Sequence, residues 1–326
     1  ENYLYSEFGR VQYNYDRKYY LTGNLRRDGA SQLGANTKYG TFWGVSAGWE
    51  VMNEKFWTSA KLDRIFSSFK VRASYGKVGN IGGLGNFASL SQFGSGLYGG
   101  NATVAYGQAG NPNLTWETSK KTDIGINFGI MKDRMTFEIG YYNSNNNGLL
   151  LFVPQPPSAG LPSTIPQNIG SMYNRGLEFA VNFSAVQKKD FSWNTRMNFN
   201  KMWNAVVGFP ANVSEFYISD TWVYGNARGG LANGGPTTTI TSHGYLRNNA
   251  GQILINPTSG LPLIDANFRV RGDRNPDFTL GWLNNITYKN LRISFLWDVK
   301  MGGDIFSMTY MWGRYAGTLE ESLYGR

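Results

Sequence analysis

The 326-residue sequence contains no cysteine and only one histidine, His243. The absence of cysteine excludes disulfide bonds, thiolate zinc sites and cysteine nucleophiles. A Ser-His-Asp triad would have to use His243, which lies within a long polar segment. No cluster of histidine and carboxylate residues has the spacing of a transition-metal site. We therefore expect no catalytic residues, no cofactor and no enzymatic activity, while calcium binding through a residue such as Asp265 stays open.

Long hydrophobic runs are also missing. The longest uninterrupted apolar run is Leu149 to Val153, whereas a helix that spans a membrane needs about 18 apolar residues. The sequence therefore predicts no transmembrane helix. A membrane location would require a closed β-barrel, because every backbone polar group must be paired within lipid.

Charged residues make up only 16% of the chain, against about a quarter in ordinary soluble domains. The net charge is +9, but basic residues follow one another only in pairs, such as Lys188-Lys189. Nucleic-acid binding favours a basic cluster. We therefore expect dispersed surface charge and no nucleic-acid partner.

The chain is instead rich in glycine and aromatic residues, with 41 glycines, 20 tyrosines, 20 phenylalanines and 10 tryptophans. Glycine suits bends and close backbone contacts. Aromatic side chains suit pleated sheets and membrane interfaces. This composition favours an all-β protein that meets a membrane.

Alternation of apolar and polar residues is the dominant pattern, and it predicts strands with two different faces. In the segment 118–130, for example, Ile124, Ile126 and Phe128 alternate with Asp123 and Gly125. We expect ten such strands and allow for an eleventh after Asp304. The ten lie near residues 5–15, 19–28, 41–51, 69–77, 118–130, 135–141, 177–184, 191–200, 278–286 and 291–300.

The expected connections are short and long in turn. Short turns fall near residues 16–17, 132–133, 188–189 and 289–290, and the segment 52–68 is intermediate. Short turns on one side and long loops on the other are typical of outer-membrane barrels, in which the long loops are extracellular. Residues 1–326 are thus expected to form one partial antiparallel transmembrane β-barrel domain. Its long extracellular loops are expected near 29–40, 78–117, 144–174 and 204–276.

The cost of charge in lipid assigns the two faces. An arginine at the middle of the bilayer costs about 2–4 kcal/mol on a barrel. Arg72, Glu178 and Arg196 all alternate with apolar residues, so their faces should line the lumen. Trp193 and Trp203 share the apolar face ten residues apart, which is about 25 Å in a strand tilted by about 40° and matches the apolar band.

Several segments, taken together and in order, carry a family resemblance. The chain resembles the C-terminal part of the barrel of SusC-like (RagA-like) TonB-dependent outer-membrane transporters. The segments that carry the resemblance are YYLTGNLRRDGAS at 19–31, YGTFW at 39–43, SAGW at 46–49, KVRASYGKVGN at 70–80, NPNLTWET at 111–118, NIGSMYNRGLE at 168–178, GDRNPDF at 272–278, YKN at 288–290 and GGDIF at 302–306.

This resemblance implies a 22-stranded barrel in the outer membrane of a Gram-negative bacterium, of which this chain holds ten or eleven strands. It also implies an internal plug domain and a TonB-binding segment, both expected in a missing N-terminal region that would contact TonB-ExbB-ExbD. A SusD-like surface lipoprotein would be the partner. The cargo would be an oligosaccharide or a peptide, imported actively. The alternative is a passive porin or a structural barrel subunit of a larger envelope complex.

No ligand-binding residue can be assigned from the sequence. Gly94, Gly96 and Gly99 spell G-x-G-x-x-G in a loop without the strand and helix that a dinucleotide site needs. The tripeptide 271–273 spells RGD within a family segment. Aromatic residues in the long loops could stack on sugars, contact a partner or pack locally. They are Tyr98, Tyr106, Phe216, Tyr217, Trp222 and Tyr224.

Overall fold

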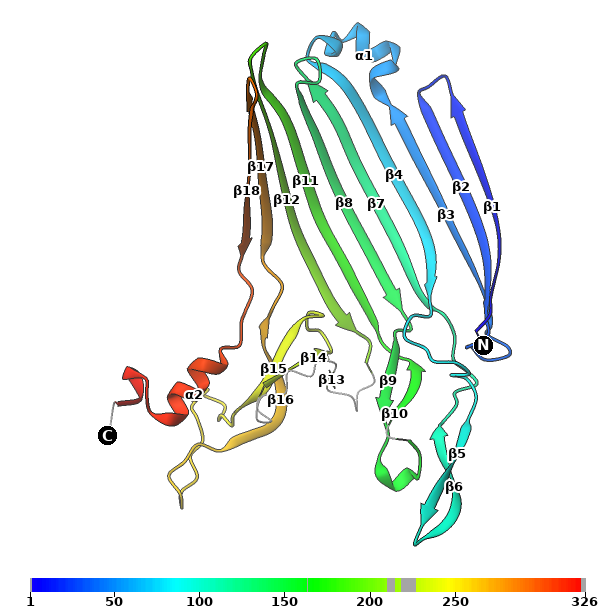
Figure 1. Cartoon of the computed structure of the whole chain (residues 1–326), viewed down its shortest axis with the longest axis vertical. Helices are drawn as coiled ribbons and strands as arrows, with labels where there is room; N and C mark the ends of the chain where they lie inside the picture. The colour runs from blue at the N-terminus through cyan, green and yellow to red at the C-terminus, as the bar shows by residue number, and fades with distance from the viewer. Residues whose placement is uncertain (1, 163, 210–214, 218–226, 324–326) are drawn as a thin grey trace. The chain divides into compact units, whose positions relative to one another are not determined.

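A computed structural model describes residues 2–162, 164–209, 215–217 and 227–323 of the chain (Figure 1). The chain divides into two compact units. The first comprises residues 1–203 and 279–299, and the second comprises residues 204–278 and 300–326. No helix among the described residues is long and apolar enough to cross a membrane.

A ten-stranded antiparallel sheet forms the first unit (Figure 1). Each strand pairs with the next strand in the order β1-β2-β3-β4-β7-β8-β11-β12-β17-β18, so all ten expected strands are confirmed. Most are longer than the alternation predicted, because their polar ends also pair. The strands are β1 (Leu4–Tyr15), β2 (Tyr19–Ala30), β3 (Tyr39–Glu50), β4 (Phe66–Asn80), β7 (Glu117–Ile130), β8 (Met135–Asn147), β11 (Ser171–Lys188), β12 (Phe191–Val207), β17 (Phe278–Tyr288) and β18 (Leu291–Met301).

The short connections gather at one end of this sheet, which we call the turn end (Figure 1). Asp16 and Arg17 have φ angles of 51° and 52°, and Lys289 has a φ of 51°. Two-residue hairpins need this left-handed backbone because it matches the twist of the strands. The link between β3 and β4 is longer and folds into short helical turns: η1 (Val51–Asn53), α1 (Lys55–Ser59) and η2 (Leu62–Arg64).

The expected eleventh strand after Asp304 is wrong. Gly302 and Gly303 adopt φ angles of 75° and 84°, which end β18, and the helix α2 (Met308–Ala316) follows. Ser307 caps this helix by accepting a hydrogen bond on Oγ from the Tyr310 backbone N–H at 3.2 Å. Serine at an N-cap favours helix initiation over a strand. The segment 305–312 was too short for its apolar pattern to distinguish a helix from a strand.

The long loops carry secondary structure of their own, which the sequence did not predict. Two hairpins belong to the first unit and a four-stranded sheet belongs to the second. These elements are β5 (Gln92–Tyr98), β6 (Asn101–Gln108), β9 (Leu150–Pro154), η3 (Pro157–Ala159), β10 (Thr164–Asn168), β13 (Glu215–Tyr217), β14 (Ala227–Ala232), β15 (Thr239–Tyr245) and β16 (Ile264–Asp273). A last short helical turn, η4 (Glu320–Leu323), follows α2.

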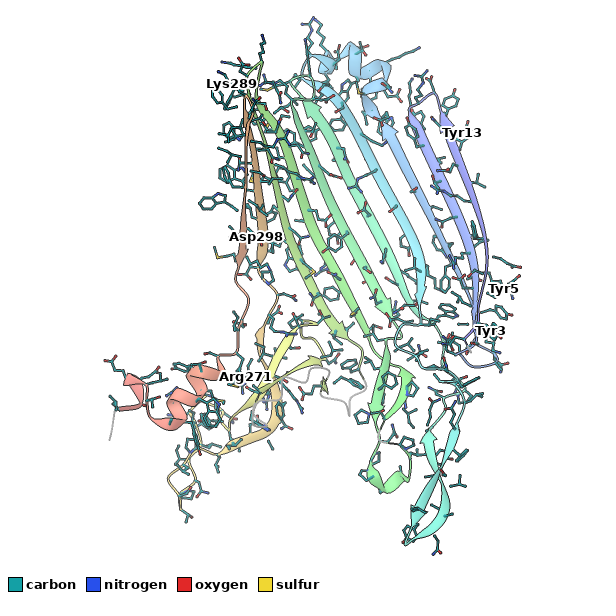
Figure 2. All side chains as sticks on the ribbon, in the orientation of Figure 1. Tyr3, Tyr5, Tyr13, Arg271, Lys289 and Asp298 are labelled. Carbon is teal, nitrogen blue, oxygen red and sulfur yellow. The ribbon has the colours of Figure 1, made fainter. Side chains whose placement is uncertain are left out.

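Aromatic rings form a continuous belt toward the turn end of the sheet. Figure 2 shows Tyr13 and Lys289 at this end, with Tyr5 at the other. Rings flanking the apolar band are typical of barrels at the membrane interface. Neighbouring ring centroids in the belt are 4.6–6.4 Å apart, in the order Tyr15, Tyr19, Trp49, Phe56, Trp57, Phe69, Phe128 and Phe137.

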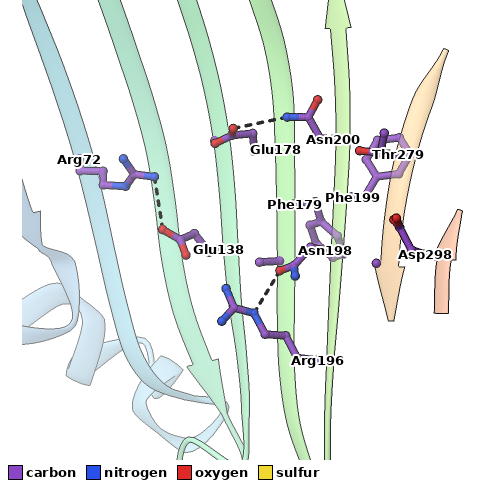
Figure 3. Close-up of a pocket in the computed structure, with 13 residues that line it drawn as sticks. Arg72, Glu138, Glu178, Phe179, Arg196, Asn198, Phe199, Asn200, Thr279 and Asp298 are labelled. Carbon is purple, nitrogen blue, oxygen red and sulfur yellow. Dashed lines mark hydrogen bonds and ion pairs between the residues drawn. The ribbon is translucent and has the colours of Figure 1, made fainter. Parts of the chain in front are cut away.

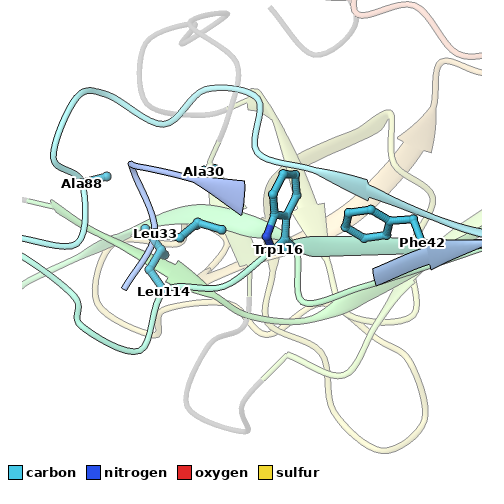
Figure 4. Packing of buried hydrophobic residues seen from close by; sticks show 6 residues of the cluster. All are labelled: Ala30, Leu33, Phe42, Ala88, Leu114 and Trp116. Atoms are coloured by element: carbon cyan, nitrogen blue, oxygen red, sulfur yellow. The ribbon is translucent and has the colours of Figure 1, made fainter. Parts of the chain in front are cut away.

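A small hydrophobic core lies where the long loops leave the sheet (Figure 4). Trp116 meets Phe42 edge to face at 5.2 Å and donates Nε1–H to the Lys38 carbonyl at 2.9 Å. Leu33 and Leu114 are fully buried beside them. The core therefore joins the loops after β2 and before β7, and fixes their bases to the sheet.

Candidate functional site

The polar face of the sheet is organised around Arg72. Its guanidinium lies across the β7 backbone and reaches two carboxylates: Nη1 contacts Asp123 Oδ1 at 2.6 Å and Nη2 contacts Glu138 Oε1 at 3.4 Å. The strand pairing aligns Arg72 with Gly125, and a side chain there would come within 2.7 Å of the arginine Nε. Glycine at 125 thus leaves the space in which a charge row crosses β4, β7 and β8.

The row continues across β11 and β12 along a cavity of about 330 Å³ (Figure 3). Glu178 Oε1 accepts a hydrogen bond from Asn200 Nδ2 at 3.4 Å. Arg196 Nε donates to Asn198 Oδ1 at 3.1 Å. Asp298 on β18 lines the same cavity. Arginine, carboxylate and amide groups side by side can both donate to and accept from a polar ligand or water.

The apolar side chains alternate onto the opposite face. Phe179 and Val181 on β11 pair with Ile139 and Phe137 on β8, and these in turn neighbour the apolar residues of β7. An arginine in lipid costs about 2–4 kcal/mol at mid-bilayer. In a membrane barrel, the face with Arg72 and Glu178 must therefore line the lumen and the face with Phe179 must meet lipid.

His243 and Asp265 contact each other and neighbouring residues within the second unit. His243 Nδ1 lies 3.0 Å from the Asp265 carbonyl oxygen, and its ring packs on Phe268 with centroids 4.0 Å apart. The Asp265 carboxylate accepts hydrogen bonds from the Asn267 backbone and from Arg269 Nε, which lower the pKa of Asp265. Within the described residues no group of three histidine or carboxylate residues could hold a metal ion.

The short sequence motifs lie in strands and turns of the sheets and hairpins. Gly94 and Gly96 lie in β5, and Gly99 with Gly100 forms its tight hairpin turn at φ angles of 55° and 83°. Asp273 of the RGD tripeptide accepts a hydrogen bond from Thr238 Oγ1 at 2.8 Å. The segment 44–48 spells G-x-S-x-G, but it lies inside β3 and not at the strand-to-helix turn of a hydrolase nucleophile.

The loop aromatic residues differ in their exposure and packing. Tyr98 is 84% exposed at the tip of the β5–β6 hairpin, and Tyr106 packs on Phe93 with ring centroids 4.6 Å apart. Phe216 is buried against Phe209, so local packing explains it. Trp222 and Tyr224 lie outside the described residues.

Comparison with known proteins decides the family. Residues 1–304 match the family model described as "TonB dependent receptor-like, beta-barrel". The chain belongs to this family. It is therefore part of an outer-membrane β-barrel, as expected, and a receptor segment instead of an enzyme.

Similar proteins place it near the SusC and RagA branch. A TonB-dependent receptor of Formosa agariphila is 31% identical over 335 residues, which cover 95% of this chain and 33% of that protein. The TonB-dependent receptor SusC of Bacteroides thetaiotaomicron is 31% identical over 214 residues, which cover 62% of this chain and 20% of SusC. The chain thus spans about a third or less of the relatives that it matches.

Solved structures agree on the fold. The RagAB peptide transporter superposes with a TM-score of 0.73 at 22% identity, covering 90% of this chain and 33% of that chain. The outer-membrane transporter YddB of Escherichia coli superposes with a TM-score of 0.52 at 10% identity, covering 94% of this chain and 34% of that chain. The resemblance to SusC-like and RagA-like barrels is confirmed.

Proposed function

We propose that this chain forms part of the barrel wall of an energised importer, which takes up an oligosaccharide or a peptide through the outer membrane. The turn end faces the periplasm and the long loops face outward. A plug fills the lumen, and TonB-ExbB-ExbD supply the energy. A SusD-like surface lipoprotein captures the cargo over the loops.

The observation that carries this proposal is the charged and amide-rich lumenal face in a chain of the TonB-dependent receptor family. A wide barrel with such a wall encloses water unless another domain fills it. Arg72 and Arg196 line the same cavity as Glu138 and Glu178, with the two carboxylates on strands between the two arginines. A wall that offers both hydrogen-bond donors and acceptors suits a long polar cargo and a polar plug equally.

The structure of the long loops is an argument for the proposed lipoprotein partner. Trp116 and Asn168 hold the loop bases rigidly, because the Asn168 side chain exchanges two hydrogen bonds of 2.8 Å with the backbone of Thr115. Loops of more than about 15 residues in compact domains usually carry function. Among the solved structures of similar fold, the RagAB peptide importer is known in 'open-open' and 'closed-closed' states.

The test is uptake by the full-length protein in its own outer membrane. Cells are supplied with labelled oligosaccharides and peptides, with and without TonB, and with and without an uncoupler of the proton-motive force. We expect uptake of one cargo class to stop when either energy component is removed. We also expect an extracellular lipoprotein to co-purify with the full-length protein.

Uptake that continues unchanged without TonB and without the proton-motive force would contradict the proposal. The chain would then belong to a passive porin or to a structural barrel. Loss of the lipoprotein alone, with TonB-dependent uptake intact, would overturn only the partner.

A further inference from the structure

Positive charge is concentrated in the connections at the turn end of the sheet. The segments 16–18, 51–65, 131–134, 188–190 and 289–290 contain ten basic and five acidic residues, a net charge of +5 out of +9 for the chain. This clustering differs from the dispersed surface charge that the sequence predicted. Strand order brings these five connections to one end of the sheet (Figure 1), where a barrel meets one leaflet of the membrane.

Several of these cations have no carboxylate partner. Arg134 donates from Nε and Nη2 to the Ser184 carbonyl at 3.3 and 3.0 Å, and from Nη2 to the Ala185 carbonyl at 2.9 Å. The nearby Asp133 carboxylate instead accepts from Ser67 Oγ at 2.7 Å and Ser68 Oγ at 3.0 Å. In the described part of the chain, the ion pairs within 4.0 Å include neither Arg134 nor the exposed pair Lys188-Lys189.

A groove of about 320 Å³ opens on the apolar face of the sheet, and one of its lining residues is Met135, which follows Arg134 in the chain. Its wall is apolar except for Thr195, whose Oγ1 accepts Nε1–H of Trp282 at 2.7 Å. Both polar atoms are therefore satisfied within the wall, and only carbon surface and sulfur face the groove. The lining residues are Met135, Val181, Phe183, Thr195, Met197 and Trp282.

A second tryptophan, on the same face of β12 as Thr195 and Met197 and nearer to the turn end, is fixed in the same way. Trp193 donates Nε1–H to Asn284 Oδ1 at 3.0 Å, and Asn284 is only 1% exposed. Indoles held by internal hydrogen bonds keep one position, so the groove has a fixed shape that mobile bulk lipid does not create. Trp282 lies six residues from the end of β17, or about 15 Å in height for a strand tilted by about 40°.

We propose that this groove and the basic turns form a binding site for an anionic glycerophospholipid of the periplasmic leaflet. One acyl chain lies in the groove against Met197 and Trp282. The phosphate lies at the turn end, where Arg134 and Lys188-Lys189 supply positive charge. The orientation rests on the proposed function, but the selectivity for an anionic lipid follows from the groove and the cations and is tested without uptake.

The experiment measures lipid retained by the purified full-length protein. Nanodiscs contain equal amounts of phosphatidylglycerol and phosphatidylethanolamine with matched acyl chains, and native mass spectrometry counts the lipids that stay bound after release. We expect wild type to retain phosphatidylglycerol preferentially. Basic residues beside an anionic surface contribute about fivefold each, so Lys188→Gln/Lys189→Gln should lower this preference by roughly 25-fold or less.

Two further variants separate charge from packing. Lys120→Gln/Lys121→Gln removes the same charge from the loop half of β7 and should leave the preference unchanged. Met197→Trp fills the groove and should reduce the retention of both lipids. Heat-modifiable gel mobility confirms that each variant is folded.

Equal retention of both lipids by wild type would overturn the proposal and indicate ordinary boundary lipid, whatever the variants do. So would an equal loss in the two lysine variants. TonB-dependent uptake by Lys188→Gln/Lys189→Gln is expected to persist, so a failure of the lipid site and a failure of the transport proposal are distinguishable.

Discussion

Phe179 and Ala180 are neighbours in the middle of β11 that point to opposite faces of the sheet. Phe179 pairs with Ile139 on the apolar face, and Ala180 alternates with it and pairs with Glu138 on the polar face. An arginine facing lipid at mid-bilayer costs about 2–4 kcal/mol, whereas one in a polar lumen meets water and carboxylates.

Phe179→Arg should therefore impair barrel assembly, and Ala180→Arg should assemble nearly normally. The folded fraction is read from heat-modifiable mobility of the outer-membrane protein on gels. Equal loss in the two variants, or a greater loss in Ala180→Arg, would reverse the face assignment.

Glu54 links the β3–β4 connection to the aromatic belt. Its Oε1 accepts Tyr19 O–H at 2.5 Å and Trp49 Nε1–H at 3.2 Å. These hydrogen bonds, followed by the charge of Lys18, lower the pKa of Glu54 below its ordinary 4.5. A depressed carboxyl pKa stabilises the fold fully above pH 4.5 and ceases to do so as the pH falls through the folded-state value.

Glu54→Gln should therefore lower the urea midpoint of unfolding at neutral pH, and the gap from wild type should close in acid. Unfolding is followed by tryptophan fluorescence in detergent micelles from about pH 3 to about pH 8, because this range includes the titration of an ordinary glutamate. A gap that is constant across this range would mean that the Glu54 charge contributes nothing.

At the scale of elements, the loop bases are more ordered than polar sequence suggested. Trp116 is 8% exposed and Leu114 is fully buried between loops that start far apart in the chain. Truncating a buried tryptophan to alanine costs about 3–5 kcal/mol. Because the core is local, this loss should loosen the loops and leave the sheet intact.

Trp116→Ala should thus speed proteolysis within residues 29–40 and 81–116 on intact cells. Tyr98→Ala is the matched control, because Tyr98 is 84% exposed and contributes little to the core. Identical cleavage of Trp116→Ala and wild type would show that another contact holds the loops.

The loops also define which side of the membrane is which. Ser95, Ser158 and Ser259 are exposed in three separate long loops. Because the chain has no cysteine of its own, each can be replaced singly by cysteine without background. All three should react on intact cells with a membrane-impermeant maleimide. Labelling that requires disruption of the outer membrane would invert the topology.

Alternation predicted all ten strands of the sheet because two-faced burial imposes a period of two. It did not predict β9 and β10, which are five residues each, because so few positions cannot establish a period. It also missed α2, whose start depends on one serine cap and a preceding pair of glycines. Boundaries were short where strands end in polar residues, as at Asn147 and Ser171.

At the scale of the whole molecule, the informative features are those that strand order assembles. The sequence placed Arg72 and Glu138 on polar faces, but their contact required the adjacency of β4, β7 and β8. The basic turn end and the aromatic belt likewise consist of residues that are distant in the chain and that the strand order brings together. The family resemblance supplied the receptor barrel, while the cargo depends on side-chain geometry that a periodic pattern does not encode.

The central claim is that the chain is a membrane barrel wall with a wet polar face and a lipid-facing apolar face. The most direct measurement is a spin-label scan along β7, with single cysteines at successive positions from 123 to 130 in the full-length protein in lipid. Ile124, Ile126 and Phe128 should be accessible to dissolved oxygen, and Asp123, Gly125 and Asn127 to a water-soluble nickel complex. Accessibility without a period of two, or with oxygen favouring the odd-numbered positions, would contradict the account.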